Sequence, residues 1–99
     1  MNQQAMLQKL RKIQREIQEA QEKIEESEYE GKATGVTALV QGNKTIIEVK
    51  ISDELLEDKE ILQDSIVAAI NSALLKIEND TNQLNEKFSG MGLPSGFGF

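Results

Sequence analysis

The first thirty residues place apolar or small side chains at alternating spacings of four and three, which gives a mean period of 3.5 residues. These positions are Met6, Leu10, Ile13, Ile17, Ala20, Ile24 and Ser27. This spacing is typical of a coiled-coil helix, and we expect one over residues 3–28 that ends before Gly31. The stripe is narrow, so another helix must cover it, either from the same chain or from a second copy.

After this segment, the spacing of the apolar residues changes to a period of two residues. Residues 33–41 and 44–51 are rich in β-formers, with Gly42 and Asn43 between them. Alternation places Val36, Ala38 and Val40 on one side of the first segment, and Ile47, Val49 and Ile51 on one side of the second. This pattern predicts two strands that form an antiparallel hairpin. Residues 29–34 are a candidate third strand, although Gly31 and Gly35 count against it.

A second long helix is predicted over about residues 59–88, with Asp58 as its N-cap. Its apolar stripe is wider than that of the first helix and comprises Leu62, Ile66, Ala69, Ile70, Ala73, Leu74, Ile77, Thr81, Leu84 and Phe88. The small residues Ala68, Ala69 and Ala73 allow another backbone to approach closely. Residues 89–99 hold four Gly and the only Pro, which predicts a flexible tail. Residues 1–88 therefore form a single α-β-α domain of the α+β class.

Composition narrows the possible functions. Only 4% of residues are aromatic and 38% are hydrophobic, so the core is thin and association would help to stabilise it. The chain has no Cys and no His, which removes the commonest catalytic and metal-binding side chains. The acids near residues 53–60 lack a calcium-loop pattern and suit a helix N-terminus. We expect no enzyme, cofactor, metal or small-molecule substrate, no membrane contact, and a cytoplasmic location.

Charge is divided along the first helix. Residues 1–15 hold four cations and no acid, a sum of +4, whereas residues 16–30 hold seven acids and one Lys, a sum of −6. The four cations, which we call the basic strip, are Lys9, Arg11, Lys12 and Arg15. They either contact phosphates or form a solvated face in which Lys12 pairs with Glu16 and Arg15 with Glu19. Two strips would offer eight cations, close to the ~6 to 10 phosphate contacts of a typical DNA binder.

Three segments together resemble the YbaB/EbfC family of bacterial nucleoid-associated proteins. They are the Gln-rich helix over residues 6–24, the block from Val49 to Asn71 and the tail segment Gly92-Leu93-Pro94-Ser95-Gly96-Phe97. The resemblance implies an α-β-α protomer that dimerises through its strands and central helices, with helix pairs projecting like the arms of tweezers. It also implies DNA binding of limited sequence specificity and no enzymatic activity.

We therefore predict a homodimer that associates with the nucleoid and contacts double-stranded DNA through the basic strip. The predicted dimer interface comprises Ile47, Val49, Ile51, Ile66, Ala69, Ile70 and Ala73. The alternative is a coiled-coil scaffold or a prefoldin-like chaperone that engages proteins through its helix ends, which the net charge of −6 favours.

Overall fold

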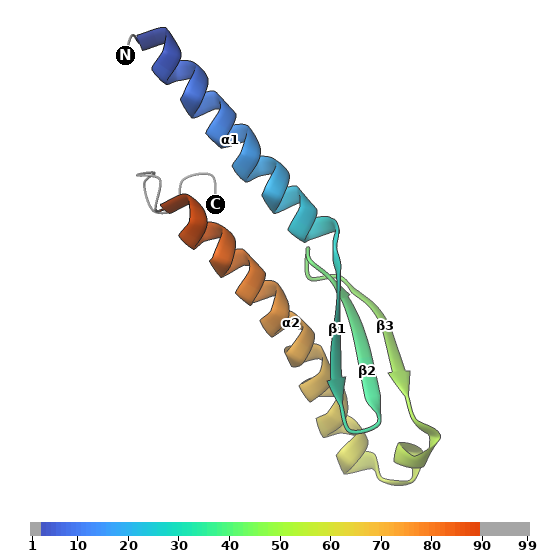
Figure 1. The fold of residues 1–99 in the computed structure, drawn as a ribbon. Coiled ribbons are helices and arrows are strands. Elements are labelled where there is room, and N and C mark those ends of the chain that lie inside the picture. The colour runs from blue at the N-terminus through green and yellow to red at the C-terminus, as the bar shows by residue number, and fades with distance from the viewer. Residues whose placement is uncertain (1–2, 90–99) are drawn as a thin grey trace.

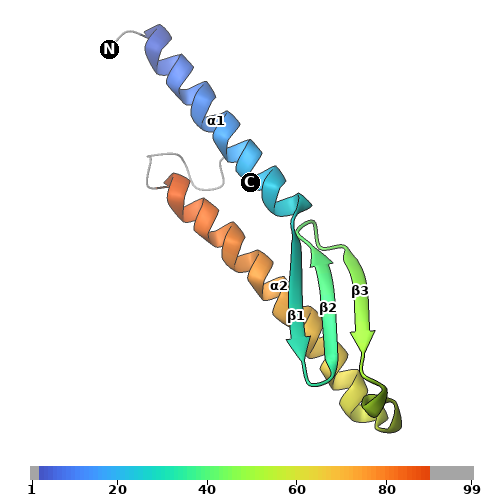
Figure 2. The same cartoon turned by 45° about the vertical axis from the view of Figure 1, so that its right-hand side comes forward.

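The computed structural model describes residues 3–89, and this part of the chain has an elongated α+β fold (Figures 1 and 2). Its elements are α1 (Gln3–Glu26), β1 (Glu28–Ala33), β2 (Val36–Gln41), β3 (Ile46–Ile51), the short 3-10 helix η1 (Asp53–Glu57) and α2 (Lys59–Ser89). The molecule extends over 69 × 18 × 13 Å. Apart from Ser89, which ends α2, the predicted tail lies outside the described residues.

The three strands form one antiparallel sheet in the order β1-β2-β3. β1 and β2 are joined by a tight turn in which Gly35 has a φ of 73°, a conformation that favours glycine. The second turn follows Gln41, whose N–H donates to the Thr45 carbonyl at 2.8 Å. The Asn43 side-chain oxygen accepts from the Thr45 N–H at 3.0 Å, so the predicted Gly-Asn turn is held by its own side chain.

Several predicted boundaries differ from the structure. The strand expected over residues 33–41 is divided, because Ala33 ends β1 and the turn at Gly35 precedes Val36. The strand expected over residues 44–51 begins at Ile46, and the first helix ends at Glu26 and not at residue 28. The candidate third strand over residues 29–34 is present as β1, so the sheet is the three-stranded one of the two expected arrangements.

α2 lies across β1 and β2, and this contact forms the main core (Figure 1). The inward side chains of β2, Val36, Ala38 and Val40, are buried, as the alternation predicted. Ala69 and Ala73 of α2 are also fully buried, and they lie against Gly31 of β1. A Cβ at Gly31 would lie 2.0 Å from the Ala69 carbonyl oxygen, so only glycine allows β1 to approach α2 this closely.

A second, smaller core joins the two helices. Ile13 and Ile17 of α1 pack on Leu84 and Phe88 of α2, and all four are buried. Their burial confirms the helix partner that the coiled-coil seam requires, at least along this part of α1. Among residues 3–89, no helix combines the length and the apolar character needed to span a membrane.

Candidate nucleic-acid interface

The N-terminal part of α1 projects beyond the contact between the two helices. Ile13 is the first buried residue of α1, and α2 ends at Ser89, directly after Phe88, which packs in the same cluster as Ile13. The apolar side chains that precede Ile13 are exposed, with 54% for Met6 and 43% for Leu10. The first turns of α1 therefore form an exposed helical arm that projects past the end of α2 in the described chain.

The basic strip lies on this arm. All four of its side chains are exposed, and three of them precede Ile13. Within residues 3–89 none of the four makes an ion pair, so the pairings of Lys12 with Glu16 and of Arg15 with Glu19 do not form in this conformation. Arg11 and Arg15 are four residues apart and share one side of the helix. The fold thus presents clustered positive charge that no acid in the described chain neutralises by direct contact.

Most of the acids lie in two groups. One group follows the strip on α1 from Glu16 onward, and a second group lies in η1 and at the start of α2. Glu86 of α2 is nearer the strip, because it is two residues before Phe88, which shares a core cluster with Ile13. η1 lies at the opposite end of the molecule from the N-terminus of α1 (Figure 1). At physiological salt the charge interaction is screened over ~8 Å, so this second group has little effect at the arm. The net charge of −6 therefore does not describe the local potential there.

Several other lysines are engaged within the protomer. Lys32 pairs with Glu30 at 3.1 Å, and Lys50 pairs with Glu48 at 3.9 Å. The Lys76 Nζ donates to the Glu30 carbonyl oxygen at 2.5 Å. These contacts distinguish the three lysines from the basic strip, whose side chains make no such contacts in the described part of the chain.

Tyr29, the only tyrosine of the chain, is part of the scaffold. Its hydroxyl donates to Asp80 Oδ2 at 2.8 Å and so joins β1 to α2. Burial, this hydrogen bond and the negative charge of Asp80 raise the pKa of Tyr29 to about 12. Sequence reasoning had no signal for this contact, because the two residues are 51 positions apart.

The acids around η1 do not form a metal centre. Among residues 3–89, no group of three or more Asp or Glu side chains lies close enough to hold a metal ion. Leu55 in their midst is buried under the turn at Gly35. This contact between Leu55 and the turn at Gly35 helps to hold η1 in place.

A second surface of interest is apolar and belongs to β3. α2 covers β1 and β2 but hardly reaches β3 (Figure 2). Ile47 and Ile51 of β3 are 45% and 39% exposed, and Ile66 and Ile70 on the adjoining flank of α2 are half-buried. In contrast, Ala69 and Ala73 have no exposed surface, because β1 already covers them. The predicted interface residues thus divide into an accessible group and two that the protomer itself encloses.

The sequence matches the YbaB/EbfC DNA-binding family over residues 1–92. A nucleoid-associated protein of Enterococcus faecalis is 37% identical over 97 residues, which cover 94% of this chain and 92% of the relative. One from Rickettsia typhi is 41% identical over 96 residues, covering 92% of this chain and 90% of the relative. The crystal structure of an uncharacterized Helicobacter pylori protein has the same fold, with a TM-score of 0.70 at 23% identity and coverage of 89% and 97% of the two chains.

Proposed function

Because the chain belongs to the YbaB/EbfC DNA-binding family, we propose that it acts at the nucleoid as a homodimer whose two basic strips contact the phosphates of one DNA duplex. The names of the relatives, nucleoid-associated proteins, support the same location. The contact is to the backbone and is largely independent of base sequence, because long cationic side chains that reach phosphates carry no base information.

The observation that carries this proposal is the exposed basic strip on the projecting arm of α1. Its side chains have no ion pair in the described chain, and no acid occurs in residues 1–15. Binding a polyanion would relieve the repulsion between Arg11 and Arg15 and would release counterions from the DNA. One strip of four cations binds weakly, so the proposal requires two strips on one assembly.

The accessible apolar group supports the dimer. β3 is an edge strand that α2 hardly covers, and its apolar Ile47 and Ile51 remain 45% and 39% exposed. β1 is the other edge, and its alternate residues Tyr29, Gly31 and Ala33 are buried or half-buried beside α2. We therefore assign the interface to β3 together with Ile66 and Ile70 of α2, and we leave out Ala69 and Ala73.

Charge reversal tests the strip. Changing Lys9, Arg11, Lys12 and Arg15 to Glu should abolish the shift of a duplex fragment in a gel titration at moderate salt. As a control for net charge, reversing four cations elsewhere, Lys23, Lys44, Lys59 and Lys87, should retain binding. Unchanged binding by the first variant would show that the strip does not contact DNA.

A single polar substitution tests the dimer. Ile51→Asp should lower the solution mass measured by light scattering from that of a dimer to that of a monomer, because the charge would be buried at the β3 edge. Leu75→Asp is the matched control, since Leu75 is 56% exposed on a part of α2 outside the assigned interface. A wild-type protein that is monomeric at working concentrations would contradict the assignment.

A further inference from the structure

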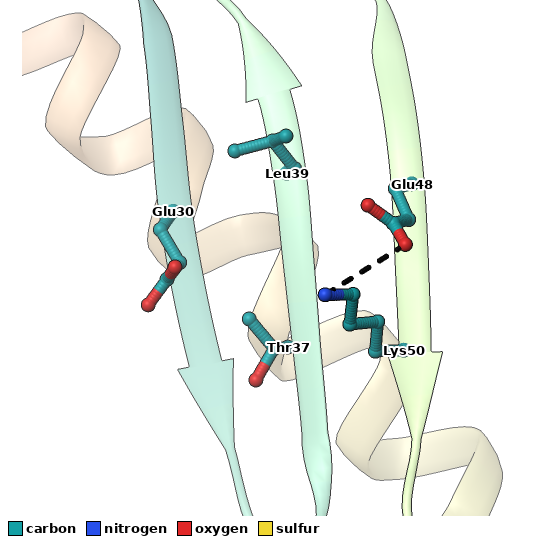
Figure 3. Close-up of a pocket in the computed structure, with 5 residues that line it drawn as sticks. All are labelled: Glu30, Thr37, Leu39, Glu48 and Lys50. Atoms are coloured by element: carbon teal, nitrogen blue, oxygen red, sulfur yellow. Dashed lines mark ion pairs between the residues drawn. The ribbon is translucent and has the colours of Figure 1, made fainter.

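The face of the sheet that points away from α2 carries a regular charge pattern (Figure 3). Glu30, Leu39 and Glu48 lie opposite one another across the three strands and form an acidic row. Two residues along each strand, Lys32, Thr37 and Lys50 form a basic row. The rows are roughly 7 Å apart, the rise of two residues in a strand. We call this surface the outer face.

The outer face is uncovered within residues 3–89. The side chains of its lysines are 72% and 73% exposed, and those of its glutamates are 50% and 51% exposed. At its centre, Thr37 and Leu39 are half-buried in a shallow hollow that Glu30, Glu48 and Lys50 also line. A less polar centre within a charged rim is the usual arrangement of a protein interface.

The two rows make the outer face complementary to itself. A two-fold axis that lies in the plane of the face, midway between the rows and parallel to them, exchanges the acidic row with the basic row. Glu30 of one copy then lies over Lys32 of the other, and Glu48 over Lys50, with both pairs repeated by the symmetry. Leu39 of each copy meets Thr37 of the other at the centre. From this geometry we propose that the outer face binds the outer face of a second copy.

Charge complementarity favours a second copy over other partners. DNA would meet the acidic row as well as the lysines, so the face offers it no net attraction. Exposed ion pairs contribute little individually, and a patch of three short strands is smaller than a standard protein interface. The contact is therefore weak and operates at high local concentration, such as that of neighbouring molecules on one polymer.

This contact is separate from the proposed DNA-binding strip and from the proposed dimer surface. It uses the opposite side of the sheet from the apolar group on β3 and α2, so one assembly has room for both contacts. The outer-face contact depends on charge and should be lost at high salt. The β3 contact is apolar and should survive it. The two associations are thereby distinguishable in the absence of DNA.

Sedimentation of the full chain over a wide concentration range tests the proposal. We call the mass at the lowest protein concentration the basal mass. At low salt, the weight-average mass of the wild type should rise with concentration toward twice the basal mass, and at high salt it should return to the basal mass. Glu30→Lys with Glu48→Lys gives a wholly basic face, and Lys32→Glu with Lys50→Glu gives a wholly acidic one. Each variant alone should stay at the basal mass, whereas an equimolar mixture should associate.

A variant with Glu57→Lys and Glu86→Lys is the matched control, since it has the net charge of the basic-face variant but an intact outer face. It should associate as the wild type does. The proposal is overturned if the wild type keeps its basal mass at every concentration, if the mixture fails to associate, or if the control also loses association. Circular dichroism of each variant verifies that the sheet is retained.

Discussion

The most demanding prediction concerns the salt dependence of DNA binding. The double variant Arg11→Gln with Arg15→Gln removes two of the four cations in each basic strip without adding acids. Both side chains are exposed, and neither makes an ion pair in the described chain, so the fold should be unaffected. The change isolates the electrostatic contribution of the strip from any effect on stability.

The number of cations in the strip sets the expected salt dependence of DNA affinity. A dimer presents eight strip cations, and at ~0.9 counterions released per phosphate the slope of log K against log salt is about −7. The double variant retains four cations, so its slope falls to about −3.6. Between 50 and 200 mM salt, wild-type affinity should fall by about 10⁴-fold and the variant's affinity by only about 10²-fold. The wild-type value is an upper bound, because Glu16 and Glu19 follow the strip on α1.

Fluorescence anisotropy of a labelled duplex, titrated at several salt concentrations, measures both slopes. The control is Lys23→Gln with Lys59→Gln, which changes net charge equally but leaves the strip intact. Its slope should match that of the wild type. An equal slope for the wild type and the Arg11, Arg15 variant would refute the reasoning, even if overall affinity had fallen.

Three further predictions concern the scaffold. Gly31→Ala should destabilise the fold by about 3 kcal/mol in urea unfolding, since its Cβ would meet two backbone atoms of α2, whereas Lys32→Ala should have little effect. Absorbance titration should place the pKa of Tyr29 at about 12 in the wild type and lower in Asp80→Asn, in which burial, the larger cause of the shift, remains but the charge of Asp80 is removed. Since the folded pKa is raised, the stability that this difference contributes is complete below pH ~10 and is lost as pH rises toward about 12; a native midpoint near 10 would contradict it. Ile17→Ala should cost ~2 to 5 kcal/mol and speed hydrogen exchange in α1 more than in β2, and equal effects on both elements would argue against a separate helix contact.

Periodicity in the sequence predicted the two helices and the alternation in β2 well, because each of these signals is local. It gave β1 only as a candidate strand, because Gly31 was interpreted as a residue that disfavours a strand. The glycine is required for a non-local reason: the backbone of α2 at Ala69 and Ala73 leaves no space for a side chain. That proximity arises only once residues about forty positions apart have packed together.

The same contact shows the limit of predicting interfaces from sequence. Small residues on the second helix correctly indicated the close approach of another backbone. That backbone is β1 of the same protomer, so Ala69 and Ala73 are enclosed before a second copy arrives. The basic strip was easier to predict, since charge clustering and outward position follow directly from the helical period. Contact between the strip and phosphate requires the proposed dimer, and the contacts between two copies are not visible in a local sequence pattern.

In the proposed dimer, the junction at Ser27 would help to determine how far apart the two strips lie. The β2–β3 turn is fastened to the end of α1, because the Gly42 N–H donates to the Ser27 carbonyl at 2.8 Å and the Asn43 N–H to the Glu25 carbonyl at 3.2 Å. α1 acts as a lever about 36 Å long, so a tilt of about 10° at this pivot moves its tip by roughly 6 Å. That displacement spans nearly two nucleotide steps along one strand of a duplex. These two hydrogen bonds, together with the packing of Ile13 and Ile17 on α2, would therefore set the distance between the two strips of the proposed dimer.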